Sequence, residues 1–210
     1  MKARNLRRAS GFLILLSFAA FNLGASDLTM GIRELGGRAL ILRGDQVLTG
    51  EEGMRLESQD QIITAVGAHA DIVWPDRWGY RMLEKSACRL EATDDVTIRL
   101  EMIVGSVLLK VGQLGEKASF EIDTPVAKAS ASGARFWSLV MPSEKGSATT
   151  FVVLDGQIHL KVKMTDEAIV LNQTQAIDIY PEQAHPEVRA IKEAETLYLE
   201  QTGDIAIESR

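Results

Sequence analysis

The sequence contains a single cysteine, Cys88, among its 210 residues. One cysteine cannot form an internal disulfide, so the fold must be held together by its hydrophobic core. We expect Cys88 to be a small buried side chain of that core. Hydrophobic residues make up 46% of the chain and charged residues 25%. This is the composition of an ordinary globular domain, and a chain of this length has enough apolar area for a core.

The usual sequence signatures of enzymes and metal sites are also lacking. The three histidines, His69, His159 and His185, form no H-x-H pair and no H-E-x-x-H helix, and there is no C-x-x-C. No G-x-S-x-G motif marks a nucleophilic serine, and Ser132, beside Gly133, has no base near it in the sequence. The sequence therefore predicts no catalytic residue, no metal ligand and no cofactor, and it indicates a protein that is not an enzyme.

No stripe of lysine and arginine interleaved with aromatic residues runs along the chain, and the formal net charge is −6. Four basic residues, Lys2, Arg4, Arg7 and Arg8, are concentrated at the N-terminus. Without residues 1–25 the balance is 19 basic against 29 acidic residues, a net charge of −10. An acidic surface repels nucleic acid and anionic lipid headgroups, so we expect neither as a partner.

The first 25 residues have the order of a secretory signal peptide. The basic cluster is followed by the apolar run Phe12 to Phe21 and then by small residues near Ala25. The apolar run is shorter than the roughly 20 residues that a membrane span needs. We expect cleavage after Ala25 and delivery to the periplasm. Retention of the segment as an inner-membrane anchor is the alternative, because Leu23 is an imperfect residue for a cleavage site.

From Gly37 onward, short runs of apolar residues alternate with polar ones and are separated by Gly, Asp, Asn and Pro. This pattern indicates an all-β domain of many short strands, either a β-sandwich or a solenoid-like fold. Asp155 and Gly156 stand between the runs Phe151 to Leu154 and Gln157 to Met164. An Asp-Gly pair favours a tight turn, so we predict a hairpin here.

The segment Pro186 to Gln201 has a helical period instead. It places Val188, Ile191 and Tyr198 on one stripe, with Ala194 or Glu195 between them. Pro186 suits a first helical position and Gly203 a C-terminal stop. The pattern predicts one amphipathic helix, packed on the β domain or on a partner. The expected organisation is a signal peptide (1–25), a β domain (26–183) and a C-terminal helix with a tail (184–210).

The stretch Thr124 to Val140, TPVAKASASGARFWSLV, combines small side chains with a central glycine. Together with Ile62 to Glu91 and Phe151 to Leu160, it resembles the FecR-like domain, named for the periplasmic sensing part of iron-citrate regulators. The matching motif positions are the threonine-proline pair, the central glycine and the aromatic that follows it. In this sequence they are Thr124, Pro125, Gly133 and Phe136.

The resemblance implies a structural role for this stretch. Gly133 would supply a backbone conformation or close approach that a side chain blocks, and Phe136 would fill the core. Ser132 and Ala134 stand where the family has arginine and threonine. We therefore expect Gly133, like Asp155 and Gly156, to be a structural turn residue.

The best-known FecR proteins are membrane regulators with a cytoplasmic anti-sigma segment. Because only a short basic stub precedes the apolar run, we do not expect sigma-factor regulation within this chain. We expect an exported, non-enzymatic binding or scaffold module that contacts an envelope protein or a cell-wall component. One alternative is a membrane-anchored signalling or regulatory component of a cell-surface sensing system. Another is a cupin-like or carbohydrate-active enzyme whose histidines or carboxylates converge in the fold.

Overall fold

The computed structural model describes residues 30–92, 97–114 and 119–207. The predicted signal peptide and its cleavage site at Ala25 lie outside the described residues. Within the described part of the chain, sixteen strands form one continuous network of hydrogen-bonded pairs, and one helix follows near the C-terminus. The predicted all-β class with a C-terminal helix is confirmed.

The network is divided into two sheets that share one long strand, β8 (Thr97–Val111). Besides this strand, sheet A contains β1 (Gly31–Gly36), β5 (His69–Trp74), β6 (Trp78–Met82), β11 (Ala134–Ser143), β12 (Gly146–Asp155), β15 (Gln175–Ile179) and β16 (Val188–Ala190). Sheet B contains β3 (Gln46–Thr49), β2 (Ala39–Arg43), β4 (Gln61–Thr64), β7 (Ala87–Ala92), β9 (Ser119–Asp123), β10 (Ala127–Ala131), β13 (Gln157–Val162) and β14 (Ala168–Asn172).

β8 belongs to both sheets because it changes partners near Gly105. Before this residue it pairs with β7 and, in parallel, with β9; after it, β8 pairs with β6 and β11. Gly105 has a φ of 96°, and a Cβ there would lie 2.4 Å from Cα of Ser86. The passage from one layer to the other therefore requires a residue without a side chain.

The main hydrophobic core fills the space between the two sheets. Tyr80 and Phe136 reach it from sheet A, and both are fully buried. The ring of Trp78 on β6 lies 5.1 Å from that of Phe120 on β9, so aromatic contacts join the layers. Cys88 lies in the same core, and burial raises the pKa of its thiol. Apolar burial supplies the cohesion that disulfides provide in many small secreted domains.

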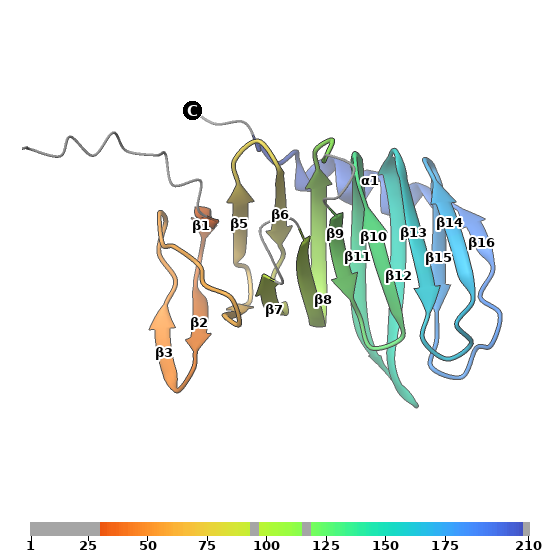
Figure 1. Ribbon diagram of the computed structural model, residues 1–210, viewed down its shortest axis with the longest axis horizontal. Coiled ribbons are helices and arrows are strands. Elements are labelled where there is room, and N and C mark those ends of the chain that lie inside the picture. The colour runs from red at the N-terminus through yellow and green to blue at the C-terminus, as the bar shows by residue number, and fades with distance from the viewer. Residues whose placement is uncertain (1–29, 93–96, 115–118, 208–210) are drawn as a thin grey trace, which may run out of the picture.

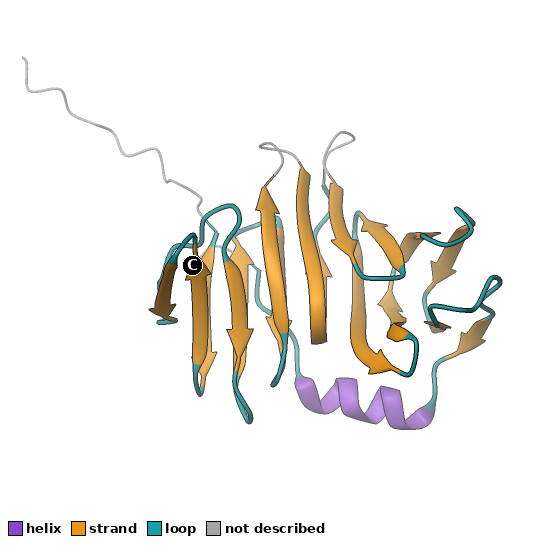
Figure 2. Cartoon of the chain, turned by 90° about the horizontal axis from the view of Figure 1, so that it is seen from below, coloured by secondary structure: helices purple, strands orange, loops and turns teal. Residues whose placement is uncertain are grey.

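The strands advance along the long axis of the molecule, from β1–β3 at one end to β14–β16 at the other (Figure 1). The helix, α1 (Glu193–Thr202), runs across the strands on one side (Figure 2). The chain thus returns over strands that precede it in the sequence, and residues 199–207 cover part of the outer face of sheet A.

The C-terminal helix is shorter than predicted, because the segment from Pro186 onward is extended before it becomes helical. The guanidinium of Arg189 on β16 binds the carboxylates of Asp178 on β15, at 2.7 Å, and Glu195 on α1, at 2.6 Å. Val188 is paired with Ile177 as part of the sheet. These tertiary contacts hold residues 188–190 in a strand that the helical period of the sequence does not reveal.

The predicted hairpin at Asp155 and Gly156 is wrong. β12 pairs with β11 and β15, whereas β13 pairs with β10 and β14, so these consecutive strands lie in different sheets. Gly156 has a φ of 73°, and a Cβ there would lie 2.4 Å from the carbonyl oxygen of Gly133. The Asp-Gly pair forms a corner between layers, at which two backbones pass close together.

The Gly105→Ala variant tests the crossing of β8 between sheets. A positive φ costs roughly 1–2 kcal/mol for a residue with a side chain, and overpacking against the Ser86 backbone adds about 1–3 kcal/mol. We expect the free energy of unfolding in urea to fall by about 2–5 kcal/mol. Gly44→Ala is the matched control, since Gly44 also has a positive φ (56°) but no atom within 4 Å of a built Cβ. Equal losses in the two variants would contradict the packing argument.

Candidate functional site

The four motif positions named from the sequence have contacts within the fold. The buried hydroxyl of Thr124 accepts hydrogen bonds from the backbone N–H of Ala127 and the hydroxyl of Thr149, each at 3.1 Å. Pro125 is exposed beside it, in the turn between β9 and β10. Gly133 has a φ of 67° in the turn between β10 and β11, and Phe136 is in the core. Their assignment as motif positions stays a prediction.

The histidines are not brought together. His69 lies on β5 in sheet A, His159 is exposed on β13 in sheet B, and His185 lies in the loop before β16. Nε2 of His69 is 3.4 Å from a carboxylate oxygen of Glu34, and Nδ1 of His185 is 3.2 Å from one of Glu167. Among the described residues, no three or more His, Cys, Asp or Glu side chains are grouped to hold a metal ion.

The outer face of sheet A carries two neighbouring rows of side chains. In the first row, Arg135 on β11, Lys110 on β8 and Gly79 on β6 are directly paired across the strands. In the second row, Leu108 on β8 is paired with Arg81 on β6. Gly79 leaves a gap in the first row, which we call the notch, beside the two cationic residues Lys110 and Arg135. Arg81 lies in the second row.

A second hydrophobic cluster lies on this outer face, separate from the core between the sheets. It joins the helix and the residues after it to the strands: Val73, Leu108, Trp137, Val152, Ala176, Leu199, Ile205 and Ile207. Leu199 is the helix residue that is fully buried there, whereas Tyr198 is 42% exposed and touches Trp137 edge-on, with ring centroids 5.9 Å apart. The contact stripe of the helix is therefore centred one residue later than the sequence pattern predicts.

Residues 203–207, which we call the strap, follow the helix across β8, β6 and β5. Side chains of the sheet bind its backbone carbonyl groups. Arg135 donates to the carbonyl of Gly203 at 3.3 Å, and Arg33 donates to that of Ala206 at 2.6 Å. The backbone N–H of Asp76 donates to the carbonyl of Ile207 at 2.7 Å.

The single acidic residue of the strap faces the cationic row. A carboxylate oxygen of Asp204 lies 3.2 Å from Nζ of Lys110, and the other lies 3.5 Å from Nε of Arg135. Burial acts to raise the pKa of this carboxyl group, but hydrogen bonds from the N–H of Ile205 and from Lys110 outweigh it, and the pKa is lowered. Asp204 is therefore held in its charged form.

The apolar residues of the strap occupy the notch in the sheet. A Cβ built on Gly79 would lie 2.9 Å from a methyl carbon of Ile207 and 3.1 Å from one of Ile205. Both isoleucines are buried, with 1% of Ile205 and 8% of Ile207 exposed. The glycine on β6 thus provides the space into which these side chains pack.

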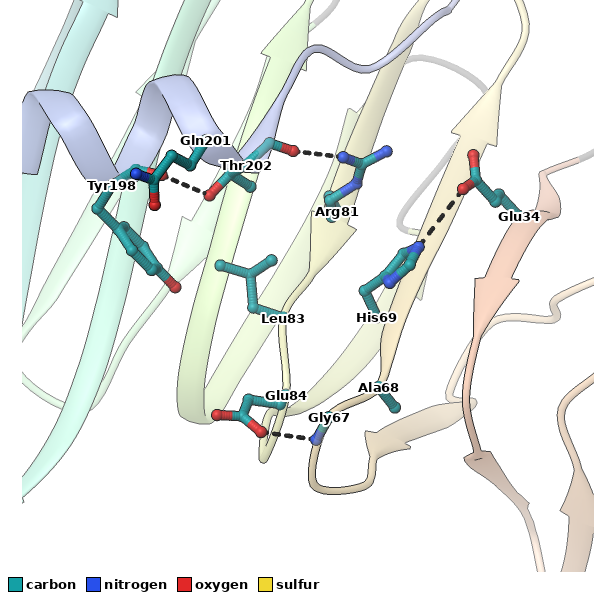
Figure 3. A pocket seen from close by; sticks show the side chains of 10 residues that line it. All are labelled: Glu34, Gly67, Ala68, His69, Arg81, Leu83, Glu84, Tyr198, Gln201 and Thr202. Carbon is teal, nitrogen blue, oxygen red and sulfur yellow. Dashed lines mark hydrogen bonds and ion pairs between the residues drawn. The ribbon is translucent and has the colours of Figure 1, made fainter.

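An open cavity of about 530 Å³ adjoins the point where the strap begins. We call it the trough; Figure 3 shows that α1 forms one side of it and strands β1, β5 and β6 the others. Its lining combines carboxylate, imidazole, amide, aromatic and aliphatic groups. The residues are Glu34, Gly67, Ala68, His69, Arg81, Leu83, Glu84, Tyr198, Gln201 and Thr202.

Arg81 links the trough to the strap. Its guanidinium makes two hydrogen bonds to the carboxylate of Asp71, at 2.6 and 2.7 Å, and donates a third to the carbonyl of Thr202. The hydrogen bonds to Asp71 raise the pKa of Arg81, so the pair is a fixed, charged anchor for the end of the helix. On the opposite side, Glu84 accepts the backbone N–H of Gly67 at 2.6 Å. The trough is a hollow with mixed polar and apolar walls.

Sequence reasoning missed both the trough and the strap. The alternation of Asp204, Ile205, Ala206 and Ile207 is a visible signal, because it places two isoleucines on one side of an extended segment. The role of Arg81 has no comparable signal, since its partners Asp71 and Thr202 are distant in the sequence.

Acidification tests the carboxylates that hold the C-terminal segment. Hydrogen bonds from Arg189 lower the pKa of Asp178; for Glu195 and Asp204, burial opposes the shift, but hydrogen bonds outweigh it and lower the pKa. Lowered values in the folded state mean that this stabilisation is complete above the unfolded pKa of about 4 and is lost as the pH falls through the folded values. We expect the near-ultraviolet circular dichroism of the Trp137–Tyr198 contact to decrease between about pH 4 and pH 2, before the core unfolds.

The matched variant for acidification is Glu195→Gln with Asp204→Asn. Its weaker C-terminal attachment should depend less on pH over the same range, because two of the titrating groups are gone. An unchanged acid transition in this variant would contradict the assignment.

Gly79→Val tests the notch that receives the strap. The branched side chain would occupy the space of the two isoleucine methyl groups. We expect hydrogen exchange at the N–H of Asp76, which the strap protects, to become at least about tenfold faster while core amides keep their rates. Gly79→Ala is the control: its single methyl group approaches Ile207, Ile205 and Val73, but it lacks the two further methyl groups of valine and should have a smaller effect. Full protection of Asp76 in the valine variant would argue against the packing described.

Among the described residues, no helix combines the length and apolar character required to cross a membrane.

Most of the residues that line the trough lie within a segment that matches a known protein family. Residues 60–159 match the family described as FecR protein. Two crystal structures of a candidate anti-sigma factor from Parabacteroides distasonis, at 1.65 Å and 2.50 Å resolution, match with TM-scores of 0.55 and sequence identities of 19% and 18%.

Each structural match covers 68% of this chain and 65% or 64% of the other, so the chain spans somewhat less than two thirds of the length of those proteins. At this identity the likeness shows a shared fold. No curated protein matches the chain. The predicted family resemblance is confirmed over the matched segment: residues 60–159 carry a FecR domain.

Proposed function

We propose that this protein is an exported, non-enzymatic binding module of the cell envelope, which contacts another envelope protein and takes part in signalling or regulation. FecR domains are typically periplasmic and non-enzymatic, and this chain carries one at residues 60–159. The acidic balance of the chain and the signal-like order of residues 1–25 are in keeping with export. Removal of residues 1–25 is part of the proposal.

The observation that carries the proposal is the trough at the border of the FecR domain. Its floor comes from residues of the domain, including Arg81 and Leu83, while its rim comes from Glu34 before the domain and from α1 after it. Tyr198 and Leu83 offer apolar surface beside the carboxylates of Glu34 and Glu84. Aromatic surface next to charged groups is typical of a protein-binding site. The fold shared with a candidate anti-sigma factor supports a regulatory role for such a contact.

Site-specific photo-crosslinking in the cells that make the protein tests this function. A photoreactive amino acid at Gln201, an exposed residue of the trough, should give one adduct of discrete mass with an envelope protein. The same amino acid at His159, exposed on sheet B, is the control and should not give that adduct. No adduct from Gln201, or the same adducts from both positions, would contradict the proposal.

A further inference from the structure

We propose that the outer face of sheet A is a groove for an extended segment of a partner protein, and that the strap fills this groove in the free protein. The proposed occupant has an acidic residue followed by two aliphatic residues at alternate positions, as Asp204, Ile205 and Ile207 do in the strap. The inference rests on the proposed protein-binding function and names the chemistry of the segment that is bound.

The way the strap is held is the first step of the argument. Residues 203–207 do not form a strand. Instead of a ladder of backbone pairs, two arginine side chains and one backbone hydrogen bond, from Asp76 to Ile207, hold the main chain of the strap. Arg135 and Arg33 donate to backbone carbonyl groups, which every peptide possesses. Such contacts recognise an extended main chain whatever its side chains are, so they suit an exchangeable segment.

Selectivity for particular side chains comes from two features of the groove, a cationic pair and an apolar notch. The ammonium group of Lys110 and the guanidinium group of Arg135 receive the carboxylate of Asp204. The notch at Gly79 receives alternate aliphatic side chains, and its neighbour Gly112 has the methyl end of Ile207 3.7 Å from a built Cβ. A cationic site followed by an apolar notch at strand spacing fits a segment of the pattern acidic, aliphatic, any, aliphatic.

The trough provides the point of entry. It is open in the free protein and begins where the strap begins, since Arg81 lines the trough and also binds the carbonyl of Thr202. An incoming segment can therefore contact the trough before the strap has left. Arg81 keeps its two hydrogen bonds to Asp71 when the carbonyl of Thr202 is replaced by one from the partner. Binding then exchanges one segment for another at each contact, and the released strap is the change that a regulatory partner would produce.

A peptide titration of the full chain tests the groove. The probe is the synthetic peptide acetyl-Gly-Asp-Ile-Ala-Ile-amide, which has the sequence of the strap. The target is the full-length variant Ile205→Ser with Ile207→Ser, in which the strap loses its apolar contacts but the chain is otherwise complete. We expect nuclear magnetic resonance shifts at Gly79 and Lys110, and a dissociation constant at least about tenfold lower for this variant than for the unchanged protein.

Three comparisons make the result specific. A peptide with lysine in place of the aspartate should bind at least about tenfold more weakly, and Gly79→Val added to the target should abolish the shifts. If the variant shows exchange of its own strap residues but no peptide-induced shifts at the groove, the proposal is overturned. If the unchanged protein forms dimers by exchanging C-terminal segments, a second copy is the occupant and the partner assignment is overturned.

The photo-crosslinking and peptide experiments fail independently. Loss of peptide binding with a specific adduct still formed at Gln201 would refute the groove and leave the binding function standing. Peptide binding at the groove without any specific adduct would refute the proposed envelope partner instead.

Discussion

The passage of β8 through both sheets is the constraint on which the rest of the molecule depends. A strand that hydrogen-bonds in one layer and then in the other must turn sharply, and Gly105 allows this turn by having no Cβ against Ser86. The hydroxyl of Ser86 accepts the N–H of Ser106 at 2.8 Å and donates to its carbonyl at 3.1 Å, so the bend is also hydrogen-bonded. Because the two layers are continuous here, the core between them forms as one unit, without a disulfide.

The outer faces of the two sheets differ in what covers them, and this difference explains why the proposed groove lies on sheet A. Strand β13 of sheet B alternates exposed and buried residues, as a sheet with one solvated face does. In sheet A, adjacent residues such as Leu108 and Leu109, or Val152 and Val153, are buried on opposite faces. The outer apolar face needs a cover, and the chain supplies one with α1 and the strap. Where that cover ends, the trough is open.

The period of two in the sequence was sufficient to predict most strands, because burial on one face imposes it locally. Sheet membership could not be predicted in the same way, since a corner and a hairpin both require glycine after Asp155. The extended conformation of residues 188–190 depends on Arg189 meeting Asp178 and Glu195, which only the folded chain brings together. For the same reason the contacts of Arg81 could not be predicted from the sequence. The alternation of apolar residues after Asp204, in contrast, was a recognisable signal for the strap.

The boundary of the FecR domain runs through the candidate site, and this has a consequence for specificity. Gly79, Lys110 and Arg135, which receive the strap, lie within residues 60–159, whereas the strap itself and the carboxylate of Glu34 lie outside. The domain therefore supplies a surface that holds an extended segment, and the flanking residues determine how firmly that surface is covered in the free protein. Other chains that share the domain but differ in the flanking residues would have the same strand surface, covered by a different segment. If a partner segment exchanges with the strap as proposed, differences in partner choice between such chains would arise from the flanks, because the cover would have to be displaced before the strand surface could bind.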